Sequence, residues 1–110
     1  MKVFNVTQNR EVISSVEVLK TFSQKSKGLI GSSSPYAVFL KTRWGIHTFG
    51  LSFPIDVVVC DTRMRVSVLR ERLVSNRMFF WNPRYPNVFE FPSGTIRKSG
   101  TRIADILELR

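Results

Sequence analysis

Short runs of β-branched and aromatic residues, each closed by turn residues, recur along the chain and constrain its fold more than any other feature. Val, Ile and Phe fit the pleated, half-buried surface of a strand better than they fit a helix. The most continuous run, IDVVVC at residues 55–60, predicts a strand that is covered on both faces. Seven to eight such runs predict a mostly β fold, either a β-sandwich or an open barrel.

One segment, at residues 23–32, has the signals of a short helix. Ser23 is a suitable N-cap, and Gly31 can adopt the left-handed backbone that often ends a helix. Residues 95–100 predict only a turn or helical bend, residues 75–87 a long loop, and residues 103–109 the last strand. The 110 residues have no linker-like stretch, so we expect a single domain over residues 1–110.

The run at residues 65–73 contains a conflict of parity. Val66 and Val68 share one parity, whereas Leu69 and Leu73 have the other. Side chains alternate strictly along a regular strand, so both sets cannot reach one core. A β-bulge near Val68 and Leu69 would resolve the conflict and turn the neighbouring arginines outward together.

Charge and cysteine usage limit the cellular setting. Seventeen Lys and Arg residues against eight acids give a formal net charge of +9, which favours a polyanionic partner or serves solubility alone. Cys60 is the only cysteine, so no internal disulfide forms, and a reducing compartment is expected. We find no apolar stretch long enough for a signal peptide or a membrane span, and so predict a cytoplasmic protein.

Three segments in series resemble a known family. They are KGLIG at residues 27–31, IHTFGL at 46–51 with PIDVV at 54–58 and Asp61, and VFEFPSGT at 88–95 followed by IAD at 103–105. Their order and spacing are similar to those of the family called domain of unknown function 192, over almost the whole chain. The resemblance implies a compact, mostly β domain of bacteria and archaea without an established biochemical role.

Two positions depart from that family's pattern. Ser32 stands where the family has an arginine, and Ala104 stands where it has a glycine. An activity that used the arginine would be lost here. Ala104 suggests that the turn needs no positive φ at this position, or that it has shifted.

The candidate catalytic residues are His47, Asp56 and Asp105. His47 could shuttle a proton with a carboxylate to orient it, or be a buried histidine that fixes a hairpin through a hydrogen bond. Asp56, in an apolar run, must be hydrogen-bonded or paired. It is either the acid of a site, a cap for the helix at residues 27–31, or the partner of an arginine. Glu90, between two phenylalanines, is expected to face outward or to lie at a strand edge.

Two further kinds of chemistry find little support. One histidine and one distant cysteine fall short of the four ligands of a structural zinc site, so we expect no metal and no cofactor. Cys60 lies among valines, where a thiol is inert.

The leading functional hypothesis is a binding or interaction module rather than an enzyme. Six arginines and one acid lie between residues 62 and 84, close to four aromatic residues at positions 79–85, a composition suited to single-stranded nucleic acid or another polyanion. The predicted polyanion-binding residues are Arg63, Arg65, Arg70, Arg72, Arg77, Arg84 and Trp81. The alternative is a small-molecule enzyme or ligand pocket around His47, Asp56 and Asp105. A pocket in which His47 meets a carboxylate would favour this alternative.

Overall fold

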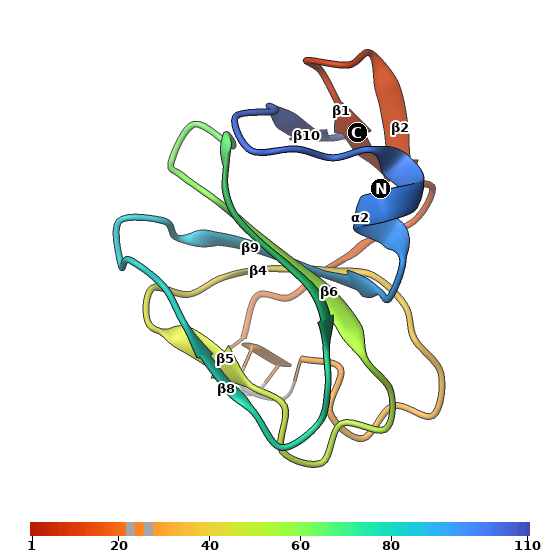
Figure 1. The fold of residues 1–110 in the computed structure, drawn as a ribbon, viewed down its shortest axis with the longest axis vertical. Helices are drawn as coiled ribbons and strands as arrows, with labels where there is room; N and C mark the ends of the chain where they lie inside the picture. The colour runs from red at the N-terminus through yellow and green to blue at the C-terminus, as the bar shows by residue number, and fades with distance from the viewer. Residues whose placement is uncertain (22–23, 26–27) are drawn as a thin grey trace.

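A five-stranded sheet forms the middle of the molecule, with the strand order β3-β4-β9-β6-β7 (Figure 1). This computed structural model describes residues 1–21, 24–25 and 28–110. The five strands are β3 (Glu17–Val18), β4 (Val38–Lys41), β6 (Ile55–Cys60), β7 (Val66–Leu73) and β9 (Asn87–Pro92). β3 runs parallel to β4, and the other neighbours are antiparallel.

One face of this sheet is covered by a three-stranded sheet and a short helix. The covering sheet has the order β10-β1-β2 and consists of β1 (Val3–Asn5), β2 (Arg10–Ile13) and β10 (Leu107–Leu109). The helix α2 (Thr95–Ser99) packs beside β2 and the end of β9 (Figure 1). Val58, Phe89 and Phe91 of the central sheet form the core here with Ile96 and Leu107.

The opposite face is covered by a ribbon of two antiparallel strands, β5 (Gly45–His47) and β8 (Met78–Phe80). Ile46 and Phe79 of the ribbon pack against a second core that contains Leu40, Val57 and Val59. Strand β6 therefore alternates between two cores, as its continuous apolar sequence requires.

The expected mostly β fold is confirmed, with several differences in its elements. The described residues contain ten strands rather than seven or eight, because partners elsewhere in the chain stabilise strands of two or three residues. β8 lies inside the expected loop at residues 75–87, and β10 begins at Leu107 rather than at residue 103. Residues 95–99 form a true helix. The helix expected at residues 23–32 includes positions 23, 26 and 27, which lie outside the described residues.

A register irregularity lies beside the pair Val68 and Leu69, at Ser67, and it lets Val66 and Leu69 pack into the same core. Val68 packs against the ribbon-side core and Leu69 against the opposite one, so both side chains are partly buried on opposite faces of the sheet. The register shifts of β7 lie on either side of this pair. At one of them, Glu71 and Arg72 together stand opposite Asp56, and Arg72 has a φ of 53°. Bulges and charges on this edge strand discourage pairing with another chain.

Candidate functional site

The three candidate catalytic residues lie in different surroundings. His47 is on the exposed ribbon, Asp56 lies beneath α2, and Asp105 lies in the turn before β10. Each of the two aspartates has its own set of hydrogen-bond donors, so the structure does not bring the three together.

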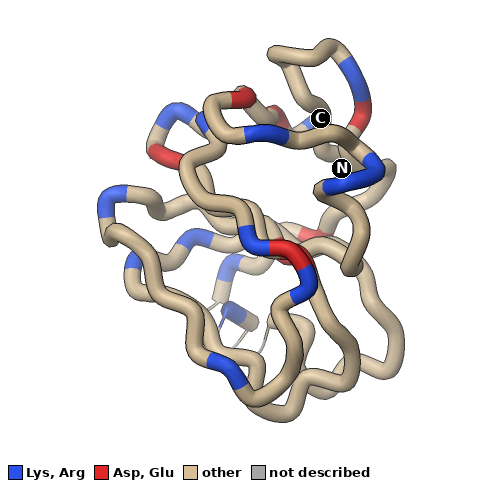
Figure 2. Tube along the Cα trace, viewed as in Figure 1, with Lys and Arg blue, Asp and Glu red and all other residues tan. Residues whose placement is uncertain are grey.

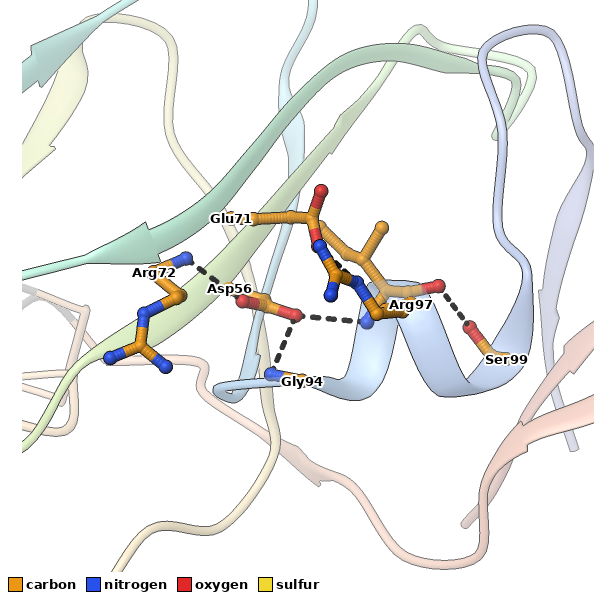
Figure 3. Close-up of polar contacts among 7 residues, drawn as sticks. Asp56, Glu71, Arg72, Gly94, Arg97 and Ser99 are labelled. Atoms are coloured by element: carbon orange, nitrogen blue, oxygen red, sulfur yellow. Dashed lines mark hydrogen bonds and ion pairs between the residues drawn. The ribbon is translucent and has the colours of Figure 1, made fainter.

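Asp56 joins α2 to the bulge of β7 (Figure 3). Its Oδ2 accepts the backbone N–H groups of Gly94 at 3.1 Å and Ile96 at 2.9 Å, and its Oδ1 accepts that of Arg72 at 3.0 Å. The carboxylate is thus an N-cap supplied from a neighbouring strand, at the helix end where negative charge is favourable. The cap predicted from the sequence exists, but on α2 rather than on the segment at residues 27–31.

Asp105 holds the last turn to the first strand. Its Oδ2 accepts hydrogen bonds from Asn5 Nδ2 at 2.8 Å, Gln8 Nε2 at 2.7 Å and the Arg102 N–H at 2.9 Å. Burial alone would raise the pKa of this carboxyl group, but the hydrogen bonds outweigh it and lower the pKa. The neighbouring Ala104 has a φ of 76°, so the turn does use a positive φ here, contrary to our expectation.

The predicted polyanion-binding arginines are all exposed: Arg63, Arg65, Arg70, Arg72, Arg77 and Arg84. Arg70 places its guanidinium carbon 6.0 Å from the centre of the Phe79 ring. Trp81 differs from the arginines, because it is half-buried and its indole N–H donates to the Tyr85 carbonyl at 2.9 Å. The most exposed aromatic residues of the chain's described part are Trp44 and Phe80.

A cavity of about 420 Å³ opens between the central sheet, the β5 strand, Lys25 and residues 28–30. Its wall is mainly aliphatic, with Leu29, Leu40, Leu51 and Ile55 as the large buried contributors. The described polar side chains around it are Lys25, Lys41, Thr42, His47, Thr48 and Glu90. A volume of this size is typical of sites for small organic ligands.

Glu90 is the buried acid of this cavity. It lies in β9, one of the inner strands, between Val38 of β4 and Val57 of β6, and is 5% exposed. The expectation that it faces outward or lies at an edge is therefore wrong. Burial raises the pKa of Glu90 from its ordinary 4.5 to about 7, although a hydrogen bond from the Leu29 backbone N–H opposes the rise.

Gly28 allows the chain to approach this carboxyl group closely. It has a φ of +52°, and a Cβ atom at this position would lie 3.1 Å from Glu90 Oε1. A side chain here would meet both a strained backbone and a crowded carboxylate. The glycine at position 28 therefore lets the backbone of Gly28 and Leu29 reach Glu90.

His47 and Thr48 border the same cavity with different roles. Thr48 is buried, donates its hydroxyl to the Val74 carbonyl at 2.6 Å and accepts the Arg77 N–H at 2.9 Å, which fixes β5 to the chain before β8. His47 is exposed and stacks on Phe49, with 5.3 Å between ring centres. The buried histidine considered from the sequence is not present.

Sequence reasoning missed Glu90 because it assumed that one face of its strand is exposed. In a strand covered on both faces, parity does not predict exposure. The available signal was an acid inside an apolar run, VFEF, of the same kind that singled out Asp56.

Two features are absent from the described part of the chain. No helix there is long and apolar enough to cross a membrane. No group of three or more His, Cys, Asp or Glu side chains in these residues is placed to hold a metal ion.

Comparisons with known proteins establish similarity of fold alone. No family model matches the chain, and no curated protein matches it. A crystal structure from Sinorhizobium meliloti, titled a "putative transcription regulator", is 16% identical, with a TM-score of 0.83 over 97% of this chain and 89% of that chain. A protein of unknown function from Novosphingobium aromaticivorans is 14% identical, with a TM-score of 0.84 over 98% of this chain and 82% of that chain. The chain thus shares its fold with these two bacterial proteins.

Proposed function

We propose that the chain is a small-molecule-binding domain whose site is the cavity around Glu90. The observation that carries the proposal is a carboxyl group, 5% exposed, in the wall of a cavity of about 420 Å³. Burying a carboxyl group costs free energy, because its charged form must leave water. A protein that keeps one in the wall of a cavity therefore gains something from it, and binding a ligand is the simplest gain. Perturbed acids in cavities are common at functional sites.

The wall of the cavity indicates the chemistry of the ligand. Leu29, Leu40 and Ile55 would contact an apolar body of a few carbon atoms. Glu90 would accept a hydrogen bond from a protonated amine or another donor group on that body. Lys25 and Lys41 also line the cavity, and they would pair with an acidic group at the other end of the ligand.

The family resemblance points to the same place. Each of its three segments contributes to the cavity, through Gly28, His47 and Glu90 in turn. The position of Ala104 also fits it, because the positive φ there explains why a glycine stands at that point of the family pattern. Membership of the family remains part of this proposal.

If the chain is an enzyme, its catalytic residues differ from those that the sequence suggested. A carboxyl group that exchanges its proton near neutral pH is suited to general acid–base catalysis. Glu90 has this property and shares the cavity with His47, whereas Asp56 and Asp105 are absent from its wall. A catalytic reaction in this chain would therefore use Glu90, and binding is the step that can be tested first.

The test is a screen of fragment-sized amines, amino acids and carboxylic acids by ligand-observed NMR. We expect fragments with an amine and a short apolar body to bind the wild type. Glu90→Gln should weaken them at least tenfold, because a hydrogen bond to a charged group contributes about 1.5–3 kcal/mol. Glu108→Gln, an exposed glutamate on β10, is the matched control and should bind as the wild type does. Fragments that bind both variants equally would contradict the proposal.

Polyanion binding by the exposed arginines is a second candidate function. It is supported by their exposure, by the net charge of +9 and by the contact of Arg70 with an aromatic ring. The neighbour titled a transcription regulator is compatible with it, although that title describes another protein. A cytoplasmic location, suggested by the buried Cys60, belongs to the same proposal.

Salt dependence tests this second candidate. Each phosphate neutralised on a single strand contributes about −0.7 to the slope of log K against log salt. If Arg63, Arg65, Arg70 and Arg72 all engage, the slope is about −3. Replacing Arg70 and Arg72 with Ser should then bring the slope about 1.4 units nearer to zero. Binding with an unchanged slope would remove these arginines from the interface.

A further inference from the structure

The outward face of the β5–β8 ribbon exposes large apolar side chains. Gly45 stands opposite Phe80 and His47 opposite Met78, so these residues share the face that points away from the core. Phe80 is 62% exposed and Met78 is 60% exposed. Trp44, directly before β5, is 74% exposed. Patches of this kind on a small protein usually mark a binding surface.

The aromatic rings of this face are held in place. A Cβ atom at Gly45 would lie 2.7 Å from Cδ1 of Phe80, so the Phe80 ring occupies the space that the glycine leaves open. Farther along β5, His47 stacks on Phe49, which is also exposed. Preorganised flat rings lose little conformational freedom when another flat group stacks on them.

The charges around the ribbon have one sign. Residues 18–55 and 72–89, which include β4, β5 and β8, contain no Asp or Glu. They contain the basic residues Lys20, Lys25, Lys27, Lys41, Arg43, Arg72, Arg77 and Arg84. Figure 2 shows the result, with acidic positions around the other sheet, α2 and the central strands, and basic positions alone along the ribbon. A partner for this face must therefore be anionic.

We infer that the ribbon face binds single-stranded nucleic acid, with Trp44 and Phe80 stacking on unpaired bases. Arg43 and Arg77, which are exposed and stand next to the exposed Trp44 and Met78, supply contacts to phosphates. The inference rests on the proposed polyanion binding. It moves the binding surface from the β7 edge and Trp81 to the ribbon. A duplex hides the faces of its bases, so exposed rings favour a single strand.

The experiment compares two labelled probes of equal length and charge by fluorescence anisotropy. One is a twelve-nucleotide oligothymidine, and the other is a phosphodiester of twelve abasic units. We expect the wild type to bind oligothymidine at least tenfold more tightly, because each stacked base contributes about 1–3 kcal/mol. Equal binding of the two probes would overturn the stacking inference and leave polyanion binding intact. If neither probe binds at low salt, both proposals fail.

Variants locate the surface. Trp44→Ala and Phe80→Ala should each weaken oligothymidine binding about tenfold while leaving the abasic probe unaffected. Tyr36→Ala is the matched control, since Tyr36 is 39% exposed but lies beside residues 13–17 and Pro92, away from the ribbon. In a Trp81→Phe background, Trp44 is the only tryptophan, and its fluorescence should be quenched as oligothymidine is added. Retained affinity in both ribbon variants, or unquenched Trp44, would place the nucleic acid elsewhere.

Discussion

Replacing Glu90 with Gln removes the one carboxyl group whose burial in the cavity raises its pKa to about 7. Between pH 4.5 and about 7, the folded protein keeps this proton while the unfolded chain releases it. The unfolded state then binds fewer protons than the folded state, so the free energy of unfolding falls as pH rises. The stabilising contribution is complete below pH 4.5 and is lost as pH reaches about 7.

The size of the effect follows from the same two values. Each pH unit between 4.5 and about 7 lowers the free energy of unfolding by about 1.4 kcal/mol, or about 3 kcal/mol in all. A change of 3 kcal/mol is a large part of the stability of a domain of this size.

Urea denaturation of the wild type and Glu90→Gln at a series of pH values provides the measurement. Glutamine does not titrate, so the wild type should lose about 3 kcal/mol relative to the variant as pH rises from 4.5 to about 7. Glu108→Gln, which leaves Glu90 in place, should keep the wild-type dependence on pH. A constant difference between wild type and Glu90→Gln across this range would refute the reasoning. It would mean that water or a cation reaches the carboxylate and preserves its charge.

Three further predictions concern stability and reactivity. Ala104→Gly should raise the free energy of unfolding by roughly 1 kcal/mol, because glycine adopts the φ of 76° without the clash of a Cβ atom. The melting temperature in thermal denaturation should therefore rise, and a fall would contradict this explanation. Asp56→Ala should lower the free energy of unfolding by about 3 kcal/mol, because the substitution leaves three backbone N–H groups without their acceptor. An unchanged midpoint in urea denaturation would argue against the cap. Cys60 should react with a thiol reagent only as fast as the protein unfolds, because burial raises the pKa of its thiol; a native rate equal to that of the unfolded chain would contradict this placement.

Several features follow from the sequence because local chemistry determines them. The IDVVVC run has no polar side to expose, so it had to become a strand between two layers, and Cys60 had to be buried with it. An acid within that run had to find several hydrogen-bond donors, and Asp56 does. Alternating apolar residues sufficed to indicate the mostly β fold.

Other features depend on contacts between distant parts of the chain. The helix α2 depends on a cap that comes from Asp56, some forty residues earlier in the chain. The sequence around residues 95–99 does not show that this cap is present. Met78–Phe80 becomes a strand only because β5 pairs with it. The parity of Val68 and Leu69 gave no indication of exposure, since it could not reveal that both faces of their sheet are covered.

The candidate site shows the same division most clearly. The residue types of the cavity, a glycine, a histidine and an acid, are visible in the sequence at residues 28, 47 and 90. Their meeting is a result of tertiary structure, because β9 lies in the interior of the central sheet and Gly28 and Leu29 lie against Glu90 of that strand. Sequence therefore determined that the continuous apolar runs, such as IDVVVC, form strands. The order of the strands decided that Glu90 is buried between β4 and β6 and lines a cavity with His47. The same tertiary structure gave Asp56 and Asp105 hydrogen-bond donors outside that cavity, where both acids stabilise turns and a helix end.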